Sequence, residues 1–130
     1  MKALIFSLFM FMPSVFATTK LNLAPLGHKV ERKTVVNFWA TWCTACIQEI
    51  AELEALKKKY PKVDFVAVNA GESKKKIARF VKKHGFTYKI LRDKDRSFSK
   101  GIEVLSLPQT FVVDETGKVL YHESTPPKKI

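Results

Sequence analysis

A β-forming run that passes directly into a helical pattern is the feature that most limits how this chain can fold. Residues 33–39 read KTVVNFW, with too little charge for an exposed edge, and so predict a central strand. Beyond Trp42, apolar side chains recur at helical spacing until about residue 60, at Cys46, Ile50, Leu53 and Leu56. A buried strand leading into an amphipathic helix is typical of α/β proteins.

The rest of the chain continues this alternation. A strand is predicted at 63–68, and a second helix follows with Ser73 as its N-cap and Gly85 at its C-terminal end. Further predictions are a short strand at 88–91, a small turn at 98–101, and strands at 110–113 and 118–121 joined by a hairpin turn at 114–117. Parallel strands joined by a helical crossover, with an antiparallel end, predict an α/β sandwich with a central mixed sheet and flanking helices.

The first residues are typical of an export signal. Lys2 precedes ten residues dominated by apolar side chains, and small residues lead up to Ala17. We therefore expect residues 1–17 to be a cleaved signal peptide and 18–130 to form one domain, soluble after cleavage, in the periplasm or another extracytoplasmic compartment. An uncleaved anchoring helix is the alternative, although the apolar run is shorter than the roughly 20 residues that span a membrane.

Positive charge is in excess, with 23 Lys and Arg against 12 Asp and Glu, for a net charge of +11. Lysines cluster at 57–59, 74–76, 82–83 and 128–129. These runs fall on the polar faces of predicted helices or at the tail, which indicates solvated surfaces that favour anionic partners or peripheral contact with membranes. A nucleic-acid-binding module is the alternative, and it is not the function we expect.

The two cysteines of the chain, Cys43 and Cys46, are separated by two residues where the strand gives way to the helix. Unpaired N–H groups and the positive end of the helix dipole favour a thiolate there. Cysteines so placed have pKa values lowered to about 3.5–7.5, against roughly 8.5 for a free thiol. Cys43 is therefore the predicted nucleophile and Cys46 the resolving thiol of a disulfide exchange that needs neither metal nor cofactor.

Other uses of two cysteines are less consistent with the sequence. A structural disulfide at this spacing would close almost no loop, and a zinc site needs two further ligands. Haem attachment would require a histidine at Ile47. A copper carrier that uses both thiols and one of the scattered histidines His28, His84 and His122 stays open.

Four segments together resemble the thioredoxin family, and most closely its extracytoplasmic branch of cytochrome c maturation and thiol-reducing proteins. They are VVNFWATWCTAC at 35–46, VAVN at 66–69, LPQTFVVD at 107–114 and GKV at 117–119. The resemblance implies that Pro108 is cis and lies beside the cysteines, that the backbone of Leu107 pairs with substrate, and that Trp42 flanks Cys43. Without the resemblance, a trans proline at a strand entry and a core tryptophan would be the simpler interpretations.

The resemblance also implies a role for Glu49, because a glutamate recurs at this position in extracytoplasmic reductants. Such a carboxylate could exchange a proton with Cys46, although a glutamate early in a helix is also favoured by the dipole alone. Asn37 stands where cytosolic thioredoxins hold a buried aspartate, which makes Glu49 the better candidate. Thr44 and Ala45 depart from the usual prolines and glycines between the cysteines, so the direction of electron flow stays open.

The family's final helix has no counterpart after residue 121, since 122–130 is short and contains Pro126 and Pro127. The exposed sheet face would then be covered by a partner or a second copy, or the domain would be marginally stable; the oligomeric state stays open. The expected function is an exported thiol:disulfide oxidoreductase, a reductant that passes electrons from a membrane donor to protein disulfides, such as those of apocytochrome c. The alternatives are an oxidant or isomerase and a non-catalytic copper carrier.

Overall fold

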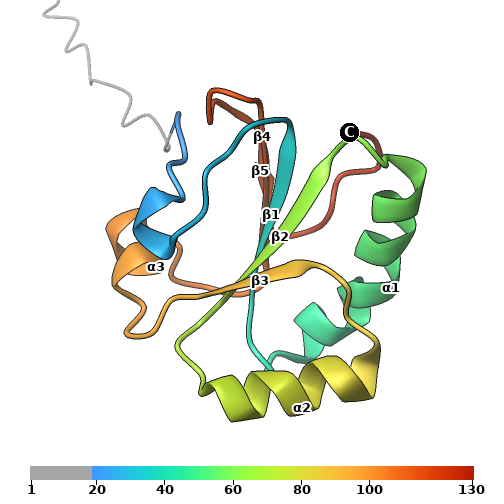
Figure 1. The fold of residues 1–130 in the computed structure, drawn as a ribbon, viewed down its shortest axis with the longest axis vertical. Helices are drawn as coiled ribbons and strands as arrows, with labels where there is room; N and C mark the ends of the chain where they lie inside the picture. The colour runs from blue at the N-terminus through green and yellow to red at the C-terminus, as the bar shows by residue number, and fades with distance from the viewer. Residues whose placement is uncertain (1–18) are drawn as a thin grey trace, which may run out of the picture.

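The computed structural model describes residues 19–130, which form nine elements (Figure 1). In chain order they are η1 (Ala24–Leu26), β1 (Thr34–Trp39), α1 (Thr44–Lys59), β2 (Asp64–Asn69), α2 (Lys74–His84), β3 (Lys89–Arg92), α3 (Ser97–Gly101), β4 (Gln109–Val113) and β5 (Val119–Glu123). The predicted signal peptide at 1–17 lies outside the described residues. Within 19–130, no helix is long and apolar enough to cross a membrane.

The five strands form one mixed sheet in the order β3-β2-β1-β4-β5. β1 pairs in parallel with β2, and β2 with β3, whereas β4 is antiparallel to both β1 and β5. The predicted α/β architecture is therefore confirmed, including the hairpin, in which the Gly117 N–H donates to the Asp114 carbonyl at 3.0 Å. Because β1 is the central strand, the loop that follows it lies in the middle of the sheet, at the C-terminal end of β1.

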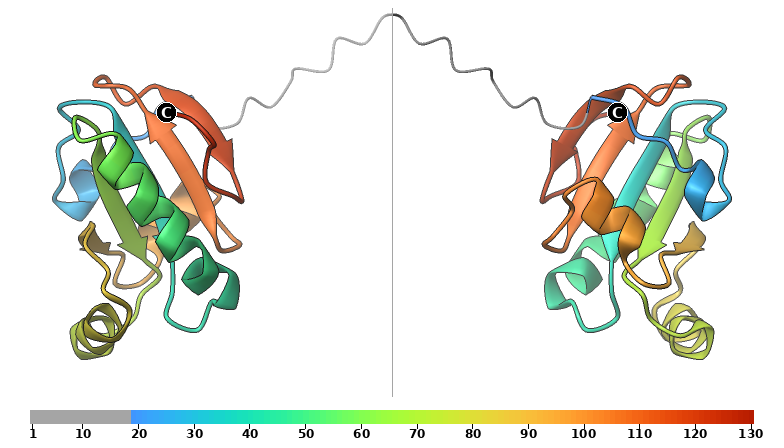
Figure 2. Two further views of the ribbon diagram at one scale, coloured as in Figure 1. Left: turned by 90° about the vertical axis from the view of Figure 1, so that its right-hand side faces the viewer. Right: turned by 90° about the vertical axis from the view of Figure 1, so that its left-hand side faces the viewer.

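Each face of the sheet carries its own core, because successive side chains of a strand point to opposite faces. Val35 and Trp39 of β1 belong to the cluster under α1 and α2. Val36 and Phe38 belong to the opposite cluster, together with Leu21, Leu23 and Val104. Figure 2 shows α1 on one side of the sheet and η1 with α3 on the other. Both faces are thus covered, which explains why every residue of β1 is buried.

The helix ends follow their local sequences. Ser73 caps α2 by accepting the Lys76 N–H at 3.2 Å, and Gly85 ends it in the left-handed conformation with φ 65°, as predicted. The turn predicted at 98–101 is instead the five-residue helix α3. Asp93, a buried carboxylate directly after β3, stabilises the start of this helix by accepting the N–H groups of Phe98 and Ser99 at 3.2 and 2.9 Å.

No helix follows β5 in the described part of the chain, as the sequence predicts. The segment 124–130, here called the C-terminal tail, turns back toward α1 (Figure 1). Pro126 and Pro127 are buried, Ile130 packs against the cluster under α1, and Lys128 pairs with Glu52 of α1 at 3.3 Å. The sequence left open whether a partner or a second copy covers this face or the domain is marginally stable, and in the structure the chain's own tail covers part of the face.

Candidate active site

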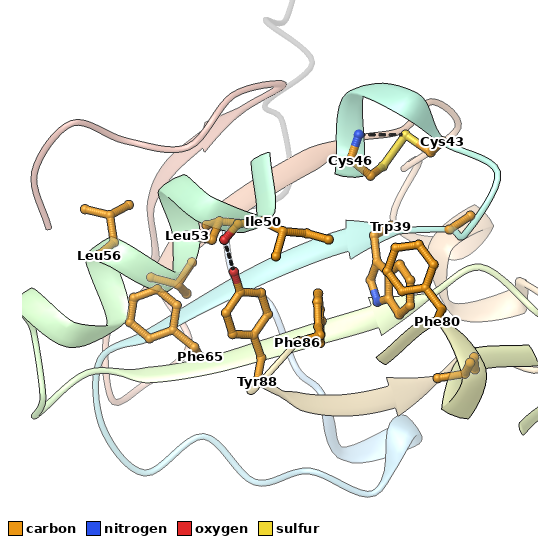
Figure 3. Close-up of a cluster of buried hydrophobic side chains, with 14 of the residues drawn as sticks. Trp39, Cys43, Cys46, Ile50, Leu53, Leu56, Phe65, Phe80, Phe86 and Tyr88 are labelled. Atoms are coloured by element: carbon orange, nitrogen blue, oxygen red, sulfur yellow. Dashed lines mark hydrogen bonds between the residues drawn. A yellow bond between two sulfur atoms is a disulfide. The ribbon is translucent and has the colours of Figure 1, made fainter. Parts of the chain in front are cut away.

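The loop between β1 and α1 carries the cysteine pair, and aromatic packing fixes where it starts. Trp39, the last residue of β1, is 1% exposed and its ring lies 5.0 Å from those of both Phe80 and Phe86, centroid to centroid. A turn follows in which the Cys43 N–H donates to the Ala40 carbonyl at 3.2 Å. Figure 3 shows the two sulfur atoms above this cluster. The loop therefore has a rigid base.

Cys43 and Cys46 are joined as a disulfide, and Cys43 is the N-cap of α1. Its sulfur accepts the backbone N–H of Cys46 at 3.2 Å, a contact that stabilises negative charge at that sulfur (Figure 3). The two residues are almost equally buried, at 5% and 4% exposed. Exposure therefore does not separate them, and the predicted difference in role depends on the position of Cys43 at the helix terminus.

Glu49 lies on α1 three residues after Cys46, close to one helical turn further on. The side chain is half-buried, and its Oε2 atom is buried without a hydrogen-bond partner. Burial, with a smaller contribution from the charge of Glu52, raises the pKa of Glu49 from 4.5 to about 7. A carboxyl group with this pKa can both accept and return a proton near neutral pH.

The three residues implied as substrate contacts lie at this end of the molecule. Trp42 is 62% exposed, so the core interpretation of this tryptophan is wrong. The peptide bond between Leu107 and Pro108 is cis, as the resemblance implies. Pairing of β4 with β1 ends at Gln109, so Leu107 lies beyond the paired residues.

A cleft of about 550 Å³ opens beside the disulfide. Ala45, from between the cysteines, and Pro108 line it together with Glu49 and the C-terminal tail; the full set is Ala45, Gln48, Glu49, Glu52, Pro108, Ser124, Thr125, Pro126 and Lys128. The structure therefore brings the predicted residues Glu49 and Pro108 to one cleft. The tail's contribution to the walls had no signal in the sequence.

Two polar contacts near the site involve residues that the sequence did not connect. Asn37, at the position where cytosolic thioredoxins hold an aspartate, is buried and donates to the Thr110 hydroxyl of β4 at 3.2 Å. Glu72, from the loop after β2, accepts the backbone N–H of Thr41 at 2.6 Å. Neither contact could be found from spacing, because each joins segments at least 31 residues apart.

The three histidines lie away from one another. His28 contacts Lys89, His84 packs on Phe80 of α2, and His122 stacks on Phe111. Across residues 19–130, no group of three or more His, Cys, Asp or Glu side chains is arranged to hold a metal ion.

Comparison with known proteins gives consistent matches. The Redoxin family matches residues 11–129. Thioredoxin-like protein YneN of Bacillus subtilis is 39% identical over 75% of this chain and 60% of its own length. Thiol-disulfide oxidoreductase ResA of the same organism is 37% identical over 65% of this chain and 49% of its own length. The chain thus spans about half to three fifths of these relatives.

Among solved structures, a thiol-disulfide oxidoreductase of Bacteroides fragilis superimposes with a TM-score of 0.65 at 26% identity, covering 71% of this chain and 72% of that one. Its fold is the thioredoxin-like fold implied by the sequence segments, and the match with Redoxin proteins extends over nearly the whole chain. The chain therefore belongs to the Redoxin family.

Proposed function

We propose that this protein is an exported thiol:disulfide oxidoreductase that reduces disulfides in client proteins through Cys43 and Cys46. The observation that carries the proposal is the position of Cys43 as N-cap of α1, with its sulfur accepting the Cys46 N–H at 3.2 Å. In the reduced protein this arrangement favours a thiolate at Cys43. The relationship to thiol-disulfide oxidoreductases such as ResA supports the same activity.

The exchange proceeds in two displacements. The Cys43 thiolate attacks one sulfur of a client disulfide, whose S–S bond breaks and releases a client thiolate, leaving a mixed disulfide. Glu49, as carboxylate, then takes the proton of the Cys46 thiol. The Cys46 sulfur attacks the Cys43 sulfur, which releases the second client thiolate and forms the disulfide seen here. Two electrons pass to the client, and a membrane dithiol donor restores the reduced pair.

Client recognition is assigned to Trp42, Leu107 and Pro108. Trp42 offers an exposed aromatic surface next to Cys43, and Pro108 shares the cleft with Ala45. Leu107 lies just before the paired part of β4, where its backbone could hydrogen-bond an extended client segment. Exposed lysines on α2 add affinity for anionic membrane surfaces, where a membrane donor would be found.

The most informative experiment captures clients in cells with a Cys46→Ser variant. Without the resolving thiol, the mixed disulfide at Cys43 persists, and the captured proteins report both clients and donor. Cys43→Ser is the matched control, since it keeps the fold and one thiol but lacks the nucleophile. If the two variants captured the same proteins equally, Cys43 would not be the attacking residue.

Electron direction is tested separately by equilibrating the pair with a glutathione buffer. A reductant should have a potential near that of thioredoxin, about −270 mV, whereas an oxidant would approach about −120 mV. A value near the upper end would replace the reductant with the oxidant or isomerase alternative.

A further inference from the structure

Beyond the residues already assigned, Glu72 connects the loop after β2 to the turn that leads into Cys43. Its side chain is 7% exposed. One carboxylate oxygen accepts the Thr41 N–H at 2.6 Å and the Asn69 amide at 3.0 Å. The other accepts the Thr41 hydroxyl and lies 3.2 Å from the ammonium of Lys76. One buried carboxylate thus holds both polar donors of Thr41.

The loop that presents Glu72 is itself fixed from three strands. The Glu72 N–H donates to the Asn69 side chain at 2.9 Å, and Arg92 of β3 donates to the Glu72 carbonyl at 2.8 Å. The Ala70 N–H donates to the carbonyl of Trp39, the last residue of β1, at 3.0 Å. The backbone that carries this carboxylate is therefore held by contacts to β1, β2 and β3.

Glu72 is ionised at neutral pH. Burial alone would raise its pKa, but the hydrogen bonds from Thr41, Asn69 and Lys76 outweigh burial and hold the pKa below its ordinary value. Hydrogen bonds to a charged acceptor are stronger than those between neutral groups. The contact to Thr41 is therefore of the stronger kind.

We propose that Glu72 is a positioning residue for the redox pair, which holds the turn at residues 40–43 so that the Cys43 sulfur stays against the Cys46 N–H. Thr41 lies two residues before Cys43, inside the turn closed by the Cys43 N–H and the Ala40 carbonyl. In the disulfide state the S–S bond restrains Cys43. In the reduced state that covalent restraint is absent, and the hydrogen bonds from Thr41 to Glu72 restrain the turn together with the bond from the Cys43 N–H to the Ala40 carbonyl.

This inference rests on the proposed nucleophilic role of Cys43, and the test uses the Cys43 thiol directly. In a Cys46→Ser background, whose backbone N–H is retained, the rate of alkylation of Cys43 by iodoacetamide is followed against pH. Glu72→Gln should raise the pKa of the Cys43 thiol by about half a unit or more, which lowers the thiolate fraction about threefold at pH values well below that pKa. A through-space effect of the Glu72 charge has the opposite sign, because its removal would favour the thiolate.

Glu54→Gln is a matched control. Glu54 also accepts two hydrogen bonds from one threonine, from the N–H and the hydroxyl of Thr87, each at 2.8 Å. It lies eleven residues beyond Cys43, however, which is about 16 Å along α1. This variant should lower stability and leave the Cys43 titration unchanged. Thr41→Val, which removes only the hydroxyl, should shift the titration in the direction of Glu72→Gln by a smaller amount, and Thr41→Ser should restore it.

Each outcome bears on one idea. A Cys43 thiol that titrates like a free thiol in the parent protein would overturn the proposed function. A low parent value that Glu72→Gln and Thr41→Val leave unchanged or lower would overturn the positioning role while sparing that function. If Glu72→Gln does not fold, Thr41→Val alone decides the question.

Discussion

The half-buried carboxyl group of Glu49 should make the stability of the protein depend on pH in a defined direction. The ordinary pKa of 4.5 applies in the unfolded chain, and burial with the charge of Glu52 raises the pKa to about 7 in the folded protein. Between these values the folded state binds more protons than the unfolded state, so stability falls as pH rises through this window. The loss of stability caused by ionising Glu49 in the folded protein is absent below about pH 4.5 and complete above about pH 7. We call this loss the ionisation penalty.

The size of the penalty follows from the rise in pKa. From 4.5 to about 7 the upper limit is about 3.4 kcal/mol, at 1.36 kcal/mol per pKa unit. Because the side chain is only half-buried, screening by water reduces this limit to an expected 1–2 kcal/mol, roughly. Glu49→Gln cannot ionise, so it should raise the free energy of unfolding by that amount at about pH 8 and leave it unchanged at about pH 4.

The assay is urea unfolding of the oxidised protein at both pH values, comparing variant with parent so that other titrating groups cancel. Glu52→Gln is the control, because this carboxylate pairs with Lys128 at the surface and makes the smaller contribution to the raised pKa of Glu49, and it should change stability by no more than about 0.5 kcal/mol. A gain from Glu49→Gln that is equal at the two pH values would refute the reasoning, since it would come from packing and not from ionisation. So would a loss at the higher pH.

Three further predictions concern other parts of the chain. Trp42→Ala should slow reduction of insulin disulfides more than reduction of oxidised glutathione, with unfolding free energy changed by no more than about 0.5 kcal/mol because the ring is 62% exposed. Gly117→Ala should lower the free energy of unfolding by more than about 1 kcal/mol, because φ is +87° and the new Cβ would lie 2.6 Å from the Leu21 carbonyl oxygen. The control in thermal unfolding is Gly101→Ala, since Gly101 has open space around it. Mass spectrometry of the exported protein should find Thr18 as its first residue, and a retained residue 1 would favour the anchoring alternative.

Periodicity predicted the parts of the fold that depend on local patterns. The buried stripe of α1 from Cys46 to Leu56, and the caps Ser73 and Gly85, were all predictable because side-chain spacing and cap chemistry are local properties. The segment with Leu21 and Leu23 was not, although both are 1% exposed. Two leucines separated by one residue, in a short stretch with a proline and a glycine, give no helical or strand pattern long enough to interpret.

Polar contacts between residues far apart in the sequence also could not be predicted. The carboxylates of Glu72 and Glu54 each accept hydrogen bonds from a threonine more than 30 residues away in the sequence. Nothing in the residue types distinguishes these two glutamates from the exposed Glu31. The loop with Glu72 reaches Thr41 because β1 pairs in register with β2, and Glu54 reaches Thr87 from α1 across the fold.

The packing of the C-terminal tail was also not predictable, and the tail lines the cleft that contains Glu49. Pro126 and Pro127 correctly predict that no helix forms there, but because proline has no N–H donor, the two residues can also be buried without leaving a donor unsatisfied. Burial of this kind leaves no periodic signature. The tail and Glu49 line the same cleft, so the surroundings of this carboxyl group include a segment whose packing the sequence does not reveal. The helical position of Glu49 was therefore predictable, whereas its proton affinity required the folded chain.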